Sequence, residues 1–344
     1  MSAAPAPPVL SKRRIQRISL ANFETRKDNI TKQLMEAATD LGFFMIEDTG
    51  ISQAEIDSMF ARGAQFFALD DKVKAAVPCD PATFVGWERD AEVSPATGFA
   101  DHKESIQVAY DQRQWGSHWP VDNNCPGFRD EALTFMGNCE SVVHKLLECF
   151  AIGLGMPYED FKKALDNSAQ DCNSAMRFMN YYDVTGRTFP TGHMRVMPHT
   201  DMSALTLLFQ RCGETGLEVC PGREATTEYA MGDEWTPCNP QQGAITVNIG
   251  DALMYWSDDK LKSNFHRVRA PNPGEYQKQR CSIAYFCQPC LSAVCQGPLK
   301  KYPPITGQQM AESRYMELDW LKGHEAKEAA AKGIAGHKLP ISVA

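Results

Sequence analysis

The chain has 344 residues, 43 acidic and 35 basic side chains, and 43% hydrophobic residues. This composition is that of a globular protein with a sizeable core, and it excludes a disordered, collagenous or disulfide-stapled chain. The formal net charge of −8 argues against nucleic acid as a partner, because duplex binding depends on Lys and Arg side chains that neutralise phosphates. No apolar run reaches the roughly 18 residues of a membrane span, so we expect no membrane partner.

The cysteine pattern favours reduced thiols. The chain has twelve cysteines, and its first residues lack the ordered basic, apolar and cleavage regions of a secretory signal. We therefore expect free thiols and a cytoplasmic location. Cys287 and Cys290 have the Cys-x-x-Cys spacing of redox and zinc elements. A second such pair is missing, so a metal or redox role for these two thiols is not favoured.

Helical periodicity dominates the N-terminal half of the chain. Apolar residues at helical spacing predict a helix over residues 30–41, which ends at Gly42 before the strand-like segment FFMIED. Ser52 and Glu55 form a capping box, which predicts the start of a second helix. A third apolar stripe predicts a long helix over residues 133–154.

From residue 177 onward the pattern changes to short β-rich runs separated by Gly, Pro, Asn and Asp. The runs are RFMNYYD, SALTLLFQ, AITVNIG, ALMYW, NFHRVRA and CSIAYFC. Closely spaced short strands imply a sandwich or barrel rather than a parallel α/β sheet. Helix formers in TGQQMAESRYMELDW and KEAAAKG predict covering helices near the C-terminus. The expected fold class is mixed α/β (α+β), with helices before and after a β-rich core.

Three residues on two of these runs have the chemistry of a metal site. His199 and Asp201 lie two apart at the entrance to a strand, where alternation places them on one face. His266 lies on a later run, which a barrel can bring opposite the first pair. Two imidazoles and one carboxylate leave three positions of an octahedron open, as in a non-haem Fe(II) oxygenase, whereas structural zinc prefers four closed ligands. His102 and Glu104 repeat the His-x-acid spacing, but no later barrel histidine is assigned to them, so they are not favoured as ligands.

Arg280 and Ser282 again share one face of a strand, just before the aromatic segment IAYF. A guanidinium and a hydroxyl together can bind a carboxylate through charge-assisted hydrogen bonds, because the Arg fork matches its two oxygens. This pair therefore suits a dicarboxylate cosubstrate.

In this order the motifs resemble those of the 2-oxoglutarate/Fe(II)-dependent dioxygenases of the isopenicillin N synthase-like family. The matching segments are GFFMIEDTGI, KES at residues 103–105, MRFMNYY, HTDMSALTLLFQ followed by GLEV, WTPCNPQQGAITVNIGDALMYWSDDKLKSNFHRVRAP, RCSIAYFCQP and YPPITGQQMAESRY. Together they span nearly the whole chain in the order of the family.

The resemblance implies roles for individual residues. It implies that the Fe(II) ligands are His199, Asp201 and His266. It implies that Arg280 and Ser282 bind the distal carboxylate of 2-oxoglutarate. Asn180 and Tyr182 resemble family positions that help to hold the cosubstrate, while Tyr181 between them is interpreted as barrel packing.

The resemblance also implies a double-stranded β-helix, or jelly roll, with flanking helices. On that basis we divide the chain into a flexible N-terminal arm (1–15), a support region of helices and strands (16–174), a jelly-roll catalytic core (175–295) and a helical C-terminal tail (296–344). All of these parts are expected to form one integrated catalytic domain.

Departures from the family pattern concern the substrate. Where many relatives have a Gly-rich approach to the His-x-Asp pair, this chain has HMRVMP, which includes Arg195. Arg195 either faces the pocket and binds an acidic or phenolate group of the substrate, or pairs with a neighbouring carboxylate. Phe84 and Trp87 are candidates for an apolar rim of the pocket, with ordinary packing as the competing interpretation.

The function implied is oxidation of a small organic metabolite with 2-oxoglutarate and O2, releasing succinate and CO2, and no obligate protein partner is expected. One alternative is an Fe(II) oxidase of the isopenicillin N synthase type, in which Arg280 and Ser282 would bind the carboxylate of the substrate itself. An inactive metal-binding barrel that carries a ligand is another. A zinc hydrolase is a third, although the chain has no His-Glu-x-x-His element to supply it.

Overall fold

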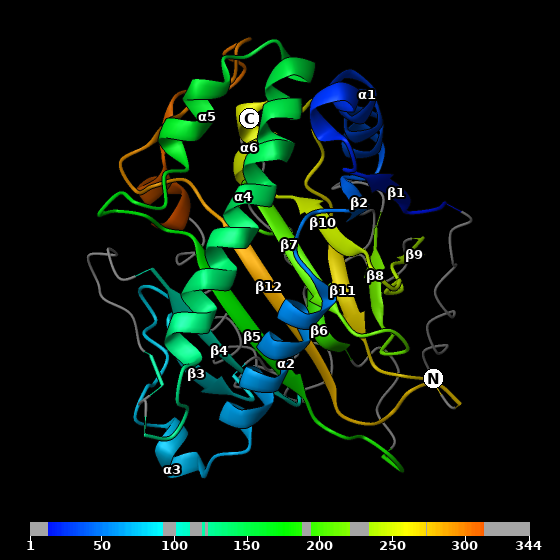
Figure 1. Ribbon diagram of the computed structural model, residues 1–344, viewed down its shortest axis with the longest axis vertical. Coiled ribbons are helices and arrows are strands. Elements are labelled where there is room, and N and C mark those ends of the chain that lie inside the picture. Colours follow the sequence, from blue (N-terminus) through cyan, green and yellow to red (C-terminus); the bar gives the residue numbers. More distant parts are fainter. Residues whose placement is uncertain are drawn as a thin grey trace, which may run out of the picture.

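The computed structural model describes residues 13–91, 101–110, 119–120, 123–187, 194–220, 234–272 and 274–312. Two β-sheets face each other in the described chain, and helices cover the outer side of the larger sheet (Figure 1). The mixed architecture of helices and sheets is the one expected from the sequence.

The larger sheet has eight strands. In spatial order they are β1 (Gln16–Ser19), β2 (Phe43–Glu47), β10 (Ile245–Ile249), β7 (Leu205–Gln210), β12 (Arg280–Cys287), β5 (Ala175–Tyr181), β4 (Lys103–Ala109) and β3 (Gly86–Arg89). The pairing of β1 with β2 is parallel and the others are antiparallel.

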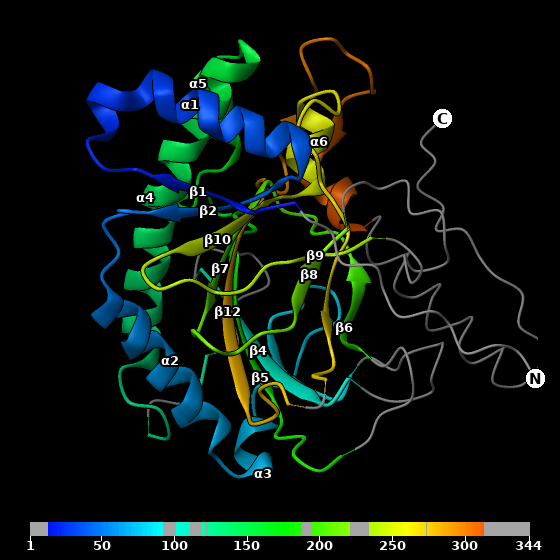
Figure 2. The ribbon, with the colours of Figure 1, turned by 90° about the vertical axis from the view of Figure 1, so that its right-hand side faces the viewer.

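The smaller sheet has four strands in the order β6 (Met194–His199), β11 (His266–Arg269), β8 (Leu217–Val219) and β9 (Thr236–Pro237). A further two-stranded sheet pairs β13 (Val294–Cys295) with β14 (Ile305–Thr306). The two larger sheets form the jelly roll, and Figure 2 shows β6, β8 and β9 on the side of the large sheet away from α1, α2 and α4.

The helices are α1 (Phe23–Asp40), α2 (Gln53–Phe67), α3 (Asp71–Lys74), α4 (Phe128–Leu154), α5 (Tyr158–Ala164) and α6 (Asp251–Trp256). The predicted capping box is present at the start of α2, where Ser52 accepts from the backbone of Glu55 and Glu55 accepts from the backbone of Ser52. The long helix α4 lies across the large sheet (Figure 1).

Alternation along the strands gives the large sheet two different faces. We call the side that packs on α1, α2 and α4 the helix face. Its side chains belong to one hydrophobic core and include Phe44, Val247, Leu207, Ile283, Phe178 and Ile106. We call the opposite side, toward the small sheet, the inner face. Its side chains include Phe43, Asn248, Thr206, Arg280, Ser282, Tyr181, Arg177 and Ser105, as the cross-strand register requires.

One predicted strand is wrong. The run ALMYW forms helix α6 rather than a strand. The helix follows β10 directly, with Gly250 as its N-cap and Asp251 as its first residue. A short apolar run has no periodicity that separates a buried strand from a buried helix. The other five β-rich runs contain strands of the two sheets.

The paired strands cross one of the expected divisions of the chain. Strands β2 and β4 come from the support region, yet they pair with β10 and β5 of the β-rich core, so one sheet crosses the boundary at residue 174. Most of the expected arm (residues 1–12) and of the expected tail (residues 313–344) lies outside the described residues.

Candidate functional site

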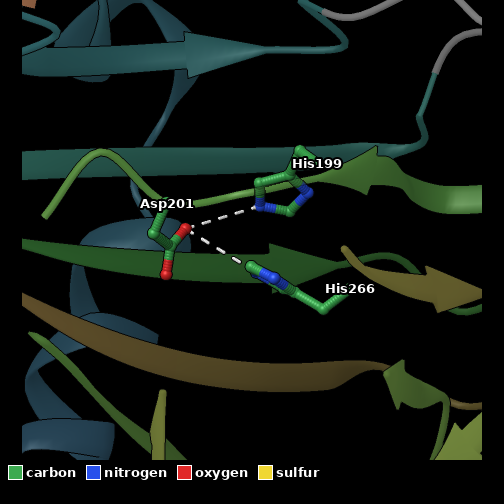
Figure 3. A group of neighbouring side chains, drawn as sticks. All are labelled: His199, Asp201 and His266. Atoms are coloured by element: carbon green, nitrogen blue, oxygen red, sulfur yellow. Dashed lines mark ion pairs between the residues drawn. The ribbon is translucent and has the colours of Figure 1, made fainter. Parts of the chain in front are cut away.

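Two histidines and one aspartate meet between the sheets. His199 ends β6, Asp201 follows it directly, and His266 begins β11. The antiparallel pairing of β11 with β6 places His266 opposite His199. The three side chains point toward one another in Figure 3, and they are the group in the described chain whose ligand atoms could hold a metal ion.

The distances suit a single ion. Nε2 of His199 lies 3.7 Å and Nε2 of His266 lies 3.6 Å from Oδ1 of Asp201. Two atoms that each bind one ion at about 2.1 Å can be no more than about 4.2 Å apart, so both separations satisfy the limit. His266 is 8% and Asp201 is 9% exposed, while His199 is partly exposed.

Backbone carbonyls orient the two imidazoles. Nδ1 of His199 donates to the Met197 carbonyl at 2.8 Å, and Nδ1 of His266 points to the Asn264 carbonyl at 3.4 Å. A carbonyl oxygen only accepts, so the proton belongs on Nδ1, and Nε2 carries the lone pair with which an imidazole binds a metal. The ring of Phe43 on β2 packs edge-on against His266, with centroids 5.2 Å apart.

Asp201 is held by its second oxygen. Oδ2 accepts from Oγ1 of Thr206 at 2.6 Å and from Nδ2 of Asn248 at 2.8 Å, which leaves Oδ1 facing the two imidazoles. Burial alone would raise the pKa of this carboxyl. The facing His266 and His199, together with these two hydrogen bonds, hold its pKa below the ordinary value. The carboxylate form that a cation needs is therefore favoured.

The turn after β10 fixes the backbone of the Asp201 loop. The amide of Asp251 donates to the Asp201 carbonyl at 2.7 Å. A Cβ on Gly250 would lie 1.9 Å from the Ser203 carbonyl oxygen, so only glycine permits this close approach.

Arg280 and Ser282 lie on the inner face of the large sheet, the same face as Thr206. Arg280 uses Nη2 to bind Oε1 of Gln210 at 2.9 Å and directs Nε toward the Glu214 carbonyl at 3.4 Å. Its Nη1 and the hydroxyl of Ser282 are fully buried without a hydrogen-bond partner among the described residues. Buried polar atoms are nearly always paired, so this orphaned donor pair fits a carboxylate ligand.

Tyr181 lies opposite Arg280 on β5. The guanidinium carbon of Arg280 is 4.8 Å from the centre of the Tyr181 ring, and that of Arg195 is 5.9 Å from it. Arg195 is only 3% exposed. Burial, and then the neighbouring Arg280 cation, lower the pKa of Arg195 to about 10. The expected substrate residue Arg195 therefore lies at the Arg280 end of the site.

The buried groups around Tyr181 carry an excess of positive charge. Arg195 and Arg280 face one buried carboxylate, Glu214, whose Oε2 accepts from the Cys281 amide at 2.8 Å. Burial raises the pKa of Glu214. Two guanidiniums against one carboxylate leave room for one more negative charge.

The structure does not bring Asn180 to this pocket. Cross-strand pairing places Asn180 with Cys281 on the helix face, where its amide is already satisfied by Oε1 of Glu104 at 3.0 Å and by Nε2 of Gln279 at 2.7 Å. Tyr182 follows on the same side, and its hydroxyl accepts from Nε of Arg89 at 3.0 Å. The expectation that Asn180 and Tyr182 hold the cosubstrate conflicts with this placement.

Trp87 is also on the helix face, paired with Ile106. Its indole donates to Oε2 of Glu104 at 2.9 Å, beside the buried Lys74, whose ammonium is 2.8 Å from the same oxygen. This corrects the expectation that Trp87 forms a rim of the pocket. It also removes the His102–Glu104 alternative, because Glu104 is occupied by these partners.

Phe84 lies in the turn before β3, where its backbone amide donates to the Asp80 carbonyl at 2.7 Å. A role for Phe84 at the pocket stays a prediction. Cys287 and Cys290 are buried free thiols, and burial raises the pKa of both, to about 11 for Cys290. Burial therefore favours the protonated form of both thiols.

Sequence reasoning missed two inner-face residues. Tyr181 was interpreted as packing, and Arg177, two cross-strand rows further along β5, was not considered. The spacing of these residues could have indicated a shared face, because residues 177, 179 and 181 of one strand project to the same side. Only the pairing of Tyr181 with Arg280 shows which face that is.

Known families match most of the chain. Residues 173–289 match the family described as the 2OG-Fe(II) oxygenase superfamily, and residues 15–124 match the family described as non-haem dioxygenase in morphine synthesis N-terminal. A relative named proline hydroxylase buaE, from Petromyces alliaceus, is 30% identical over 77% of this chain and 82% of its own. The chain is a member of the 2OG-Fe(II) oxygenase superfamily.

Other comparisons with this oxygenase agree. The 2-oxoglutarate-Fe(II) type oxidoreductase ppzD of Metarhizium majus is 27% identical over 89% of this chain and 95% of its own. A full-length Neurospora crassa protein, solved with alpha-KG and thymine, shares the fold with a TM-score of 0.76 and 24% identity, over 88% of this chain and 96% of its own.

The oxygenase therefore uses Fe(II), 2-oxoglutarate and O2, as members of its family do. Within the described residues, no helix has the length and apolar character needed to cross a membrane.

Proposed function

We propose that His199, Asp201 and His266 bind Fe(II), and that Arg280 with Ser282 binds the distal carboxylate of 2-oxoglutarate, in the oxidation of a small organic molecule. The observation that carries this proposal is the orphaned pair of buried donors, Nη1 of Arg280 and Oγ of Ser282, on the face where Thr206 supports Asp201. When bound, iron would activate O2 with 2-oxoglutarate as the co-reductant: in a hydroxylation, one oxygen atom enters the C–H bond of the substrate and the other enters the succinate that 2-oxoglutarate forms with loss of CO2.

The residues of the chain divide the remaining work. The triad would supply three protein ligands to the ion and leave its other positions to the cosubstrate and O2. The carbonyls of Met197 and Asn264 keep the imidazole protons on Nδ1, and Thr206 with Asn248 keeps Asp201 ionised and turned toward them. The orphaned donors near Arg280 fix the far end of the cosubstrate and so set its direction toward the metal.

We assign Arg195 to the cosubstrate as well. It shares the Tyr181 ring with Arg280 and has no ion pair with a described residue. A second guanidinium gives the pocket the positive charge that a carboxylate neutralises, whereas Arg280 alone would be balanced by Glu214. This assignment replaces the expected contact of Arg195 with the substrate.

The relatives support a small substrate. One is named a proline hydroxylase, and one structural neighbour was solved with thymine. The twelve free cysteines support a reducing compartment, and we propose that the oxygenase works in the cytoplasm.

The test is formation of labelled succinate from labelled 2-oxoglutarate by the iron-loaded oxygenase. We expect Arg280→Gln and Arg195→Gln each to raise the KM for 2-oxoglutarate by about 10- to 100-fold, because each removes a charged hydrogen bond. Oxygen-free binding of 2-oxoglutarate should weaken in parallel. No succinate under any condition would instead favour the oxidase that does not use 2-oxoglutarate.

Arg89→Gln is the matched control. Arg89 lies on the helix face against Tyr182, so its loss should leave the KM for 2-oxoglutarate unchanged. A rise as large as that of Arg280→Gln would return Tyr182 to the cosubstrate site. An unchanged KM in Arg195→Gln with slower substrate oxidation would return Arg195 to the substrate.

A further inference from the structure

A second group of charged side chains lies on the inner face, on strands β3, β4 and β5. The register pairs Glu88 with Ser105 and Gln107 with Arg177, and it pairs Arg177 with Ala284 on β12. Cross-strand partners project to the same side of a sheet. Ala284 lies two residues from Ser282, so this group faces the same space as the proposed iron and cosubstrate site.

Two buried neutral residues hold the charged pair in place. Oγ of Ser105 donates to Oε1 of Glu88 at 2.8 Å, and Nε of Arg177 donates to Oε1 of Gln107 at 2.9 Å. Ser105 and Gln107 are buried. Each charged side chain is thus held by a hydrogen bond to a buried neighbour, as a binding residue should be.

The pair itself is open. Nη1 of Arg177 lies 3.8 Å from Oε1 of Glu88, and the two side chains remain 20% and 22% exposed. A closed charge-assisted hydrogen bond is about 1 Å shorter. Oε2 of Glu88 and the terminal amines of Arg177 make no hydrogen bond to any residue that the structure describes. A cation and an anion are therefore both available to a ligand.

The position of the pair limits the size of that ligand. Arg177 is two strands from β7, roughly 10 Å at about 4.8 Å per strand, and β7 carries Thr206 beside Asp201. The inner-face residue between Arg177 and β7 is Ala284, paired with Leu208. The side chain of Ala284 is a single methyl group, so no large side chain of β12 stands between Arg177 and β7 in this row.

We propose that Arg177 and Glu88 bind the head group of a free α-amino acid, with the carboxylate at Arg177 and the ammonium at Glu88. The open fork of Arg177 matches the two oxygens of a carboxylate, and the free oxygen of Glu88 accepts from an ammonium placed beside it. The side chain of the amino acid then extends past Ala284 toward β7 and the proposed metal site. This proposal rests on the proposed function, since it names the substrate of the same site.

The test uses the iron-loaded oxygenase and four forms of each of the proteinogenic amino acids: free, N-acetylated, C-amidated and both. We expect at least one free amino acid to raise succinate formation and to bind the oxygen-free complex with 2-oxoglutarate. Blocking either end should lower its kcat/KM by about 10- to 100-fold, because a charged hydrogen bond is lost.

Two variants assign each end. In Arg177→Gln the free and the C-amidated compound should become equally weak, while N-acetylation still costs affinity. In Glu88→Gln the free and the N-acetylated compound should become equally weak, while amidation still costs affinity. Arg62→Gln removes a similarly exposed guanidinium from the Glu131 pair between α2 and α4, and it should keep the wild-type preference for the free compound.

The outcomes separate the two proposals. If the wild type converts 2-oxoglutarate to succinate but no free amino acid raises the rate or binds, the amino-acid proposal is overturned and the proposed function stands. Equal losses for charged and blocked compounds in both variants overturn it as well. If the wild type forms no succinate at all, the proposed function fails first and the amino-acid proposal fails with it.

Discussion

The two faces of the large sheet are made from the same strands but treat polar groups in opposite ways. On the helix face the charges satisfy one another: Glu104 accepts from Lys74, Trp87 and Asn180 inside an apolar core. On the inner face, buried donors of Arg280 and Ser282 remain without a described partner. A closed polar network serves folding, whereas an open one awaits a ligand.

Substitutions on the inner face should therefore lower activity with little loss of stability. Substitutions on the helix face should lower stability with little loss of activity.

Asp201→Asn has the largest expected effect on activity. It replaces the one anionic ligand, so metal affinity should fall by more than about 100-fold and iron-dependent turnover should be lost. Metal binding and succinate formation measure this, with the exposed Asp40→Asn as control. Turnover like that of the wild type would remove Asp201 from the proposed ligands.

Lys74→Met tests the helix face. It leaves the buried Glu104 without its cation, which should cost about 3–5 kcal/mol of folding free energy. Denaturant unfolding measures the loss. Lys27→Met, at a partly exposed pair with Glu148, should cost no more than about 1 kcal/mol. The KM for 2-oxoglutarate of Lys74→Met should stay unchanged while the protein is folded, and a specific rise in that KM would break the separation of the faces.

Thr206→Val sharpens the comparison within the inner face. Removal of the hydroxyl that binds Oδ2 of Asp201 should weaken metal binding about 10-fold. Thr246→Val is the control. Thr246 lies on β10 and also faces the inner side of the sheet, but its hydroxyl accepts from Gln210 and does not bind Asp201. Metal titration of the two variants should therefore differ, and equal losses would mean that the hydrogen bond to Asp201 does not position it.

Glu214→Gln has the smallest expected effect. Burial raises the pKa of Glu214 in the folded state. Ionisation of this carboxyl therefore lowers the stability of the fold, and the loss is complete once the pH has risen through the folded-state pKa. Below the unfolded-state pKa of about 4.3 the loss is absent. The variant should therefore be slightly more stable at pH 7, and its advantage should shrink toward pH 4. It should also bind 2-oxoglutarate a few-fold more tightly, because one competing carboxylate near Arg280 is gone. Weaker binding would show that Glu214 orients Arg280.

Periodicity predicted the helices α1, α2 and α4 and the strands β2, β5, β7, β10, β11 and β12. It did not predict α3 or α5, and it assigned a strand to α6. The spacing of His199, Asp201 and His266 predicted that these residues converge. Sequence reasoning could not assign the faces of β5. Whether Asn180 or Tyr181 faces the pocket depends on the register against Arg280, and a shift of one residue exchanges the faces.

Irregular backbone hid the position of Arg195. The pairing of β6 with β11 shifts between Val268 and Arg269, so simple alternation from His199 does not place Arg195. A bulge of this kind redirects a side chain without a clear mark in the sequence.

The insertion of β2 between β1 and β10 has a consequence for the separability of the molecule. Phe43, which packs on His266, and Asn248, which holds Asp201, are cross-strand partners although they lie far apart in the chain. A fragment that begins at residue 175 would present β10 as a bare, apolar edge open to aggregation. Late, long-range pairing of this kind also slows folding. Exchange of catalytic halves between homologous enzymes should therefore succeed only when the first strands travel with them.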